Sequence, residues 1–201
     1  MPPLVNLRDY LELLRSNGQL LTIDEPVDPF LEIAEIHRRV IDRGGPALLF
    51  TRVKDSAFPV VTNLFGTNQR LEMAFGRRPV DFVRGLVDLA EHAMPLSPTT
   101  LWQRRSLFTD GLRIGLKQVR RGPVLDCCQQ PARLGSLPML TSWHSDGGAF
   151  VTLPLVYTEH PEGLGHNLGM YRIQRHDDTS TGIHWQIHKG GGYHYWAAEQ
   201  T

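Results

Sequence analysis

The residues best suited to chemistry gather near the carboxyl end of this 201-residue sequence, where seven of its nine histidines lie at or after His144. Side chains two positions apart share one face of a strand. If residues 183–188 form a strand, His184, Gln186 and His188 therefore line one surface. Taken alone, such an alternation is more typical of a solvent-facing strand than of a surface that binds a ligand, and both interpretations stay open.

The run from Lys189 to Gly192 precedes a predicted helix. Glycines let a backbone approach a ligand closely, and the amides at the start of a helix attract anions. The run therefore indicates either a phosphate site or an ordinary glycine turn. The sequence has no GxGxxG after a strand, no GxxxxGK[ST] and no paired CxxC motif, which disfavours the common nucleotide and zinc sites.

Two further sets of residues contain side chains that can act as nucleophiles. Cys128 could act as a nucleophile, but nothing in the sequence identifies its base, so we interpret it as structural. The side chains of a hydrolytic triad occur together at His144, Ser145 and Asp146. A triad is defined by the geometry of its side chains, however, and the sequence has no nucleophile elbow, so this interpretation is disfavoured. The enrichment of histidine near the carboxyl end also keeps a histidine-based metal hydrolase open as a possible class of protein.

The composition narrows the class of protein. Lys and Arg number 21 and Asp and Glu also number 21, so no basic excess favours nucleic acid or an anionic membrane as a partner. Apolar residues make up 41% of the chain, enough for a folded core. Cys127 and Cys128 are neighbours that cannot readily bridge, and no run approaches the roughly 20 apolar residues of a membrane helix. We therefore expect a soluble, cytoplasmic protein with no membrane span.

Capping residues and apolar runs divide the first half into short elements. Helices are predicted to begin at four capping or first-turn residues, namely Asn6, Asp28, Thr67 and Pro79. Gly18 and Gly44 are placed to end the first two helices. Strands are predicted at 20–23, 47–50 and 59–65. Residues 4–93 therefore indicate one unit of mixed helices and strands.

The second half has a different pattern. Between Pro95 and Gly122, Pro, Ser, Arg and Gly accumulate as in a connector. Beyond it the sequence predicts strands at 150–158, 168–174 and 183–188, the last two joined as a hairpin through the polar residues 175–182, and a helix that starts near Tyr193. We therefore place domains at residues 1–94 and 123–201, with a connector at 95–122.

Six ordered segments together carry more information than any one of them: Asn6–Leu11, Pro26–Pro29, Gly44–Phe50, Asn63–Thr67, Asn167–Arg172 and His184–Gly191. With them the chain resembles the N-terminal part of the UbiD family of prenylated-flavin-dependent decarboxylases, which includes polyprenyl-hydroxybenzoate carboxy-lyase. The resemblance implies an α+β fold, with an N-terminal α/β domain followed by the first part of a split β-barrel domain that binds flavin.

The resemblance also implies roles for individual residues. Asn167 matches the family's amide ligand to Mn²⁺, with K⁺ as an additional candidate cation, and His188 stands where some members place an imidazole ligand. Arg172 matches the arginine that grips the substrate carboxylate, and it is the catalytic residue that the resemblance implies. The residues matching the segments that contact prenylated FMN are Met170, Tyr171, Arg172, His184, Trp185, Gln186, Lys189 and Gly190.

The implied activity is non-oxidative (de)carboxylation of an aromatic or α,β-unsaturated carboxylic acid. The family's glutamate metal ligand and catalytic acids lie beyond position 201, so we expect this chain to need a C-terminal half or a complementing subunit for activity. A homo-oligomer, and a flavin prenyltransferase as the source of the cofactor, are also implied. The alternative is a stand-alone flavin- or metal-binding module that docks to a partner and has no activity of its own.

Overall fold

The computed structural model describes residues 4–76, 78–92, 102, 105, 109 and 119–201. The chain forms two compact units, one made of Met1–Gln19 and Phe65–Cys128 and the other of Leu20–Leu64 and Gln129–Thr201. Each unit is thus assembled from two separate stretches of sequence. The domain boundaries at residues 94 and 122 stay predictions, and most of the predicted connector lies outside the described residues.

The first unit contains α1 (Leu7–Ser16), α3 (Asn68–Phe75), α4 (Arg78–His92) and a short 3₁₀ turn, η1 (Pro123–Leu125). The side chains of Asn6 and Thr67 accept hydrogen bonds from the backbone N–H groups of Asp9 (3.1 Å) and Arg70 (3.3 Å), which confirms both predicted caps. The hydroxyl of Tyr10 donates to the carbonyl of Arg70 at 2.8 Å, and this bond joins α1 to α3.

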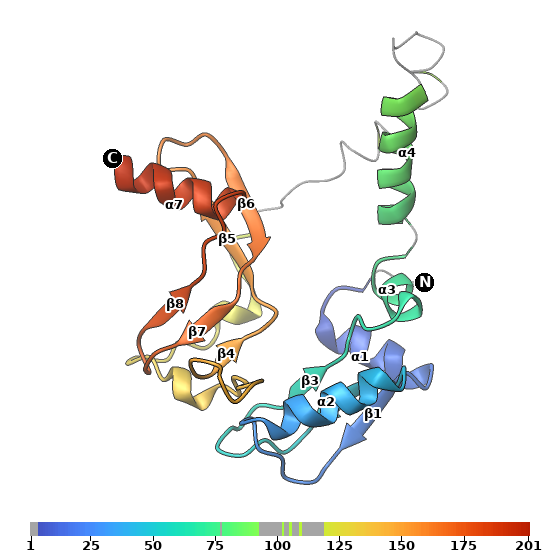
Figure 1. Ribbon diagram of the computed structural model, residues 1–201, viewed down its shortest axis with the longest axis vertical. Coiled ribbons are helices and arrows are strands. Elements are labelled where there is room, and N and C mark those ends of the chain that lie inside the picture. Colours follow the sequence, from blue (N-terminus) through green and yellow to red (C-terminus); the bar gives the residue numbers. More distant parts are fainter. Residues whose placement is uncertain (1–3, 77, 93–101, 103–104, 106–108, 110–118) are drawn as a thin grey trace. The chain divides into compact units, whose positions relative to one another are not determined.

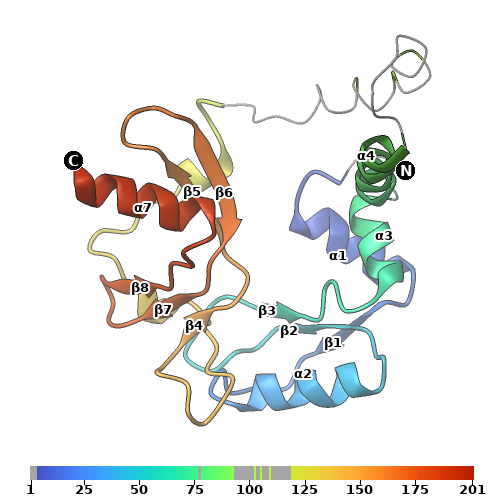
Figure 2. The same cartoon turned by 45° about the horizontal axis from the view of Figure 1, so that its top comes forward.

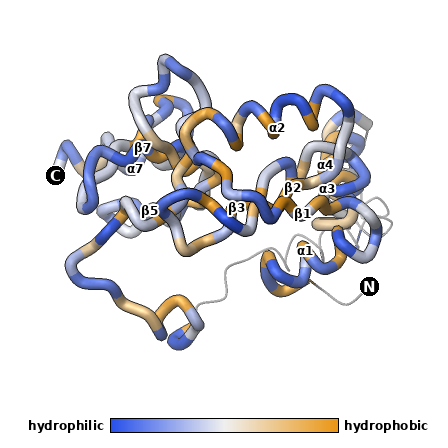
Figure 3. The backbone as a smooth tube through the Cα atoms, turned by 90° about the horizontal axis from the view of Figure 1, so that it is seen from below, coloured by the Kyte–Doolittle hydropathy of each residue, from blue (hydrophilic) through white to orange (hydrophobic). Residues whose placement is uncertain are grey.

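The sheet of the second unit contains β1 (Leu20–Ile23), β2 (Ala47–Phe50) and β3 (Val60–Thr62), with β1 parallel and β3 antiparallel to β2. Helix α2 (Glu32–Asp42) runs along this sheet (Figure 1, Figure 2), and its tube alternates between hydrophobic and hydrophilic residues (Figure 3). Its apolar side carries Ile33, which is fully buried in one cluster with Leu48 and Phe50 of β2.

The predicted start of α2 at Asp28 is wrong, because the helix begins at Glu32, after Leu31 with a φ of 65°. A long-range contact explains the delay. The N–H of Leu31 donates to the carbonyl of Thr141 (2.9 Å), and the N–H of Thr141 donates to the carbonyl of Pro29 (3.2 Å). This pairing holds residues 29–31 outside the helix and attaches the second stretch of the unit to the first.

The remaining strands form two small antiparallel sheets. One contains β4 (Phe150–Val151), β7 (Ile173–Arg175) and β8 (Thr181–Ile183), and the other pairs β5 (Leu155–Glu159) with β6 (His166–Met170). Helix α7 (Gly190–Gln200) contacts both β5 and β6 (Figure 1), and a 3₁₀ turn, η2 (Leu134–Ser136), precedes the strands.

The predicted strands in this region are partly wrong. The run 150–158 breaks at 152–154, where Pro154 has no N–H to donate, the run 168–174 breaks at 171–172, and the run 183–188 ends at Ile183. The hairpin through the polar loop is confirmed, with Arg175 opposite Thr181, but its strands are β7 and β8. The helix expected near Tyr193 is confirmed as α7 and begins earlier, at Gly190.

Helices and strands are therefore mixed throughout the described chain, as the sequence predicts. The split β-barrel implied by the family resemblance stays a prediction for the two small antiparallel sheets. Among the described residues, none of the helices has the length and hydrophobicity that a membrane-spanning segment needs.

Candidate functional site

Asn167 lies in β6 directly opposite Thr158 of β5. Its Nδ2 donates to the hydroxyl of Tyr171 at 3.3 Å and to the hydroxyl of Thr158 at 3.5 Å. Both interactions use the amide nitrogen, so the amide oxygen Oδ1 receives no hydrogen bond from any residue that the structure describes. Asn167 therefore presents an oriented amide whose oxygen is available to a cation or to a donor.

Tyr171 joins three segments at this point. Its side chain is buried, with 3% exposed, and its hydroxyl accepts a hydrogen bond from the N–H of Gly191 at 2.8 Å. Its ring meets that of Trp185 edge-on with centroids 5.0 Å apart, and Lys189 Nζ lies 5.6 Å from its centroid. The buried phenol thus brings the segment before α7, and the first turn of α7, against β6.

Two glycines allow the start of α7 to approach so closely. A Cβ atom at Gly190 would lie 2.6 Å from Asn167 Oδ1, and a Cβ atom at Gly191 would lie 2.8 Å from the hydroxyl of Tyr171. A side chain at either position would overlap its neighbours unless the Asn167 amide or the Tyr171 and Trp185 rings moved, so this close approach depends on glycine. The glycine run therefore sets the N-terminus of α7 beside the Asn167 amide oxygen.

The electrostatics at this helix end favour an anion. The first turn of α7 contains no acidic residue, and its N-cap, Lys189, makes no side-chain capping bond. A helix N-terminus carries a partial positive charge, to which the ammonium of Lys189 adds a full one. Phosphate is the kind of group that such a terminus accommodates.

Thr158 also belongs to a second polar cluster, with His194 and His160, which the sequence did not predict. Its hydroxyl lies 3.0 Å from Nδ1 of His194, whose ring lies edge-on to that of His160 with centroids 5.5 Å apart. His160 is 6% exposed, and its Nδ1 accepts a hydrogen bond from the N–H of Glu162 at 3.2 Å. Its Nε2 is buried without a partner in the described part of the chain.

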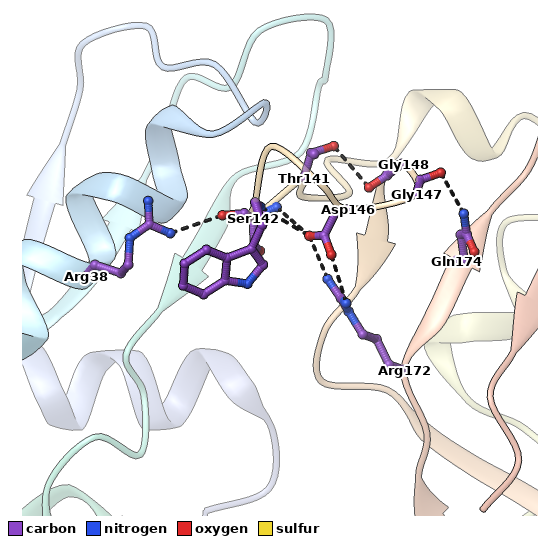
Figure 4. A network of polar contacts seen from close by, with 9 residues as sticks. Arg38, Thr141, Ser142, Asp146, Gly147, Gly148, Arg172 and Gln174 are labelled. Atoms are coloured by element: carbon purple, nitrogen blue, oxygen red, sulfur yellow. Dashed lines mark hydrogen bonds and ion pairs between the residues drawn. The ribbon is translucent and has the colours of Figure 1, made fainter.

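Arg172 makes a separate set of contacts (Figure 4). Its Nη1 and Nη2 donate to Oδ1 and Oδ2 of Asp146 at 3.1 and 2.9 Å, a bidentate ion pair. Its guanidinium carbon lies 3.6 Å from the centroid of the Phe150 ring. Asp146 Oδ2 also accepts from the N–H groups of Ser142 (3.1 Å) and Trp143 (3.2 Å). The hydrogen bond from Arg172, followed by the backbone donors, holds the pKa of the Asp146 carboxyl below its usual range.

These contacts test the two nucleophilic sites considered from the sequence, the hydrolytic triad and the cysteine. Asp146 is engaged by Arg172 and by its own loop, and no described contact joins it to His144, so the structure gives the triad interpretation no support. Cys127 and Cys128 are free and exposed. The pair between residues 146 and 172 has no sequence signal, because its members are 26 positions apart and only the fold brings them together.

The segment after β8 differs from its prediction. Because the strand ends at Ile183, the expectation that His184, Gln186 and His188 line one strand face is wrong, and all three side chains are exposed. The backbone turns there instead, with the N–H of Lys189 donating to the carbonyl of Gln186 at 3.0 Å. In the described part of the chain, no hydrogen bond joins Asn167 to His188.

The other cofactor residues expected from the resemblance lie on two sides of β6. Trp185 is partly buried between the rings of Tyr171 and Tyr195, the latter with centroids 6.1 Å apart. Met170 is 50% exposed on the face of β6 opposite Asn167. The structure thus brings together Asn167, Tyr171, Trp185, Lys189 and Gly190, and places Arg172 in its own group with Asp146.

Two domains of one known family match most of the chain. The 3-octaprenyl-4-hydroxybenzoate carboxy-lyase N-terminal domain matches residues 11–90, and the Rift-related domain of the same carboxy-lyase matches residues 117–201. The chain belongs to the UbiD family. The predicted family is therefore confirmed, and five of the six motif segments lie within the matched ranges.

Curated UbiD relatives are much longer than this chain. A Chlamydia trachomatis protein is 50% identical over 196 residues, which cover 97% of this chain and 34% of the relative. A Chlamydia pneumoniae protein, named as one subunit of a 4-hydroxybenzoate decarboxylase, is 47% identical over 194 residues, which cover 96% of this chain and 33% of that protein. The chain spans about a third of the length of these relatives.

Solved structures share the fold. An evolved dimeric form of the UbiD-class enzyme HmfF from Pelotomaculum thermopropionicum, in complex with prFMN, matches with a TM-score of 0.69 and 25% identity over 96% of this chain and 41% of that chain. The closed form of the vanillic acid decarboxylase ShVdcCD from Sedimentibacter hydroxybenzoicus matches in fold, with a TM-score of 0.76 and 23% identity over 100% of this chain and 41% of that chain. The mixed α/β fold is thus that of UbiD-class enzymes.

Proposed function

We propose that the chain is the N-terminal portion of a prenylated-FMN- and Mn²⁺-dependent (de)carboxylase of aromatic or α,β-unsaturated carboxylic acids. The observation that carries the proposal is the junction where Asn167 of β6, the buried Tyr171 and the glycine-rich start of α7 meet. In a member of the UbiD family, this junction supplies the residue types that a flavin phosphate and its cation need.

The donor set fits a hard divalent cation. The amide oxygen of Asn167 receives no described hydrogen bond, while its nitrogen is held by Tyr171 and Thr158, so the oxygen keeps one orientation. A carbonyl-type oxygen such as that of an amide suits manganese, whereas imidazole is a ligand common to several transition metals. Asn167 and the exposed His188 are the residues of this chain that would hold Mn²⁺, and K⁺ is a second candidate cation.

The fit extends to the phosphate and the flavin. Lys189 and the first-turn backbone around Gly190 would hold the phosphate, because both contribute positive charge with no acidic residue in that turn. The side chains of His184, Trp185 and Gln186, together with Met170 and Tyr171, would flank the rest of the cofactor. Tyr171 acts through packing, since its hydroxyl is already used by Gly191 and Asn167.

Arg172 is the catalytic residue in this proposal. Its guanidinium can bind a substrate carboxylate through two parallel N–H···O bonds and orient the bond that breaks. Loss of carbon dioxide from such an acid requires an electron sink, which bound prenylated FMN supplies. The family resemblance assigns none of the catalytic acids to this chain, so in this proposal proton delivery comes from elsewhere in the complete enzyme.

The names of similar proteins support a partner. The Chlamydia pneumoniae relative is named as one subunit of a decarboxylase, and the Sedimentibacter enzyme is called VdcCD. We propose that this chain works with its C-terminal half or with a complementing subunit, forms a homo-oligomer when complete, and receives its cofactor from a flavin prenyltransferase. The substrate is a small carboxylic acid.

A reconstitution experiment tests the proposal. The complete enzyme is mixed with reduced prenylated FMN and MnCl₂ and passed over a gel-filtration column. We expect flavin-type absorption to elute with the protein, and Asn167→Ala to weaken manganese retention while the fold is preserved. Protein that elutes without flavin absorption would contradict the proposal, whereas retained flavin without decarboxylation of any aromatic or unsaturated acid would favour the binding-module alternative.

The role of Arg172 has its own test. Arg172→Ala in the complete enzyme should lower the rate of decarboxylation by more than about tenfold, equivalent to about 1.4 kcal/mol. Most of the flavin retention on the column should persist, because Arg172 is one of several proposed cofactor contacts and the proposed phosphate and metal contacts come from other residues. A smaller loss of rate shows that Arg172 does not grip the carboxylate.

A further inference from the structure

The guanidinium of Arg172 is held on one edge and on one face. Asp146 accepts from its two terminal nitrogens, at 3.1 and 2.9 Å (Figure 4), and the ring of Phe150 covers one face, with its centroid 3.6 Å from the guanidinium carbon. An arginine has five N–H donors, and this end-on pair uses two of them. The edge formed by Nε and one terminal nitrogen has no acceptor in the described part of the chain, and that edge can bind a second carboxylate side-on.

Asp146 is the more fixed member of the pair. Its side chain is 10% exposed against 41% for Arg172. Two backbone N–H groups, those of Ser142 and Trp143, hold its Oδ2 at 3.1 and 3.2 Å. A long side chain such as arginine loses much conformational entropy when it is fixed, so an acceptor that is already anchored determines which rotamer the arginine keeps.

The loop that carries Asp146 is anchored to α2 in the same unit. Arg38 of α2 donates through Nη1 to the carbonyl of Ser142 at 3.0 Å (Figure 4), and its guanidinium carbon lies 4.6 Å from the centroid of the Trp143 ring. Arg38 is itself held by Glu35, one turn earlier in α2, at 2.7 Å. A continuous series of contacts therefore runs from the packed helix α2 to Arg172.

We propose that Asp146 is a positioning residue for the arginine that grips the substrate carboxylate. It holds the terminal nitrogens of Arg172 so that the Nε edge faces the substrate, and it does not itself touch the substrate. This inference rests on the proposed function of Arg172. It predicts that loss of the Asp146 charge weakens the binding of acids specifically, because only acids use the oriented edge.

The test compares an acid with its neutral isostere. Dissociation constants for 4-hydroxybenzoate and 4-hydroxybenzamide are measured on the complete enzyme, loaded with prenylated FMN and Mn²⁺, for the natural protein, Asp146→Asn and Asp177→Asn. The Asp177 variant is the control, because among the described residues that carboxylate bonds within its own loop, to Thr179 and Ser180. We expect Asp146→Asn to weaken 4-hydroxybenzoate binding about tenfold and to change 4-hydroxybenzamide binding less than about twofold, with both unchanged in the control.

The other outcomes are decisive. If Asp146→Asn weakens the binding of both ligands equally, Asp146 has a structural role only. If it tightens the binding of 4-hydroxybenzoate, Asp146 competes with the substrate for Arg172. Either result overturns the inference. If Arg172→Ala weakens the binding of 4-hydroxybenzoate while Asp146→Asn does not, the inference fails and the proposed function stands. If Arg172→Ala leaves acid binding unchanged, the proposed role of Arg172 fails first.

A crystal structure of the Asp146→Asn enzyme gives a check that needs no substrate. With the charge removed, we expect the guanidinium of Arg172 to leave its place over Phe150 or to lose defined density. A guanidinium that keeps its position over the ring shows that Phe150 and the backbone are sufficient to hold it, and overturns the inference.

Discussion

At the scale of single residues, the candidate site depends on how close two backbones come. Gly190 lets the first turn of α7 lie against the amide of Asn167, where a Cβ would be 2.6 Å from Oδ1. The nitrogen of the same amide is held by Tyr171, so the amide cannot turn away without breaking a hydrogen bond. The position of the proposed metal-binding oxygen is therefore sensitive to one methyl group.

Gly190→Ala tests this dependence. The new methyl group should displace the Asn167 amide and lower manganese retention several-fold, while the far-ultraviolet circular dichroism stays unchanged. Metal content after dialysis, measured by mass spectrometry, gives the result. Gly122→Ala is the matched control, because a Cβ there meets nothing within 4 Å. Equal metal content in both variants contradicts the proposed site.

Asp146 makes the stability of the folded protein depend on pH. Its pKa is lowered in the folded protein, chiefly by the hydrogen bond from Arg172, so folding favours its charged form. The resulting stability is complete above the unfolded value of about 3.9 and is lost as the pH falls from there towards the folded value. We expect the natural protein to be more stable than Asp146→Asn at neutral pH, with the difference shrinking below about pH 4. Denaturant titrations over this range check it, and a constant difference speaks against the ion pair.

At the scale of secondary-structure elements, α2 carries the anchor of the Asp146 loop, and its apolar side fixes its place on the sheet. Ile33 is fully buried there, whereas Ile41, at the other end of the same helix, is 44% exposed. Truncation of a buried isoleucine costs the lost transfer free energy and leaves a cavity. Truncation at a partly exposed position such as Ile41 removes less buried apolar surface and leaves no enclosed cavity.

We therefore expect Ile33→Ala to lower the free energy of unfolding by about 2–5 kcal/mol and Ile41→Ala to lower it by no more than about 1 kcal/mol. Urea titrations followed by tryptophan fluorescence measure both. Similar losses in the two variants would mean that α2 does not pack through the side that carries Ile33.

Local signals were enough to predict most of the first half of the chain. The caps Asn6 and Thr67 and the strand at 47–50 follow from nearby residues, because capping bonds and apolar runs are local. The start of α2 could not be predicted in this way, since Thr141 pairs with residues 29–31 from more than a hundred positions away.

The site was predicted less completely. The alternation at 183–188 fits a strand, but Trp185 packs on Tyr171 and the backbone turns at Gln186, so tertiary contacts override the periodic pattern. The motif Asn167–Arg172 identified the family, yet Asn167 bonds to Tyr171, while Arg172, which lies beyond the end of β6 at Met170, pairs with Asp146. The partner of Arg172 comes from a loop that carries no motif for it.

At the scale of the whole molecule, the second unit depends on both of its stretches. Leu140, from the second stretch, packs against the cluster of Ile33, Leu48 and Phe50 from the first. The backbone pairing of Thr141 with Pro29 and Leu31 adjoins this contact. We infer that the sheet of β1 to β3 and the strands that bear the site unfold together.

Leu140→Ala tests that cooperation. It should lower the protection from hydrogen exchange in β2 and in β7 to a similar extent, because both belong to one cooperative unit. Leu137→Ala, at a position that is 40% exposed, is the control and should leave both strands protected. Loss of protection in β2 alone contradicts a shared unit.

The most direct test of the central claim is anomalous diffraction at the manganese edge from crystals of the complete enzyme grown with MnCl₂ and prenylated FMN. We predict an anomalous peak within ligand distance of Asn167 Oδ1, beside the first turn of α7, with the flavin phosphate against that turn. A manganese peak that lies away from Asn167, or flavin bound on another surface, would contradict the account.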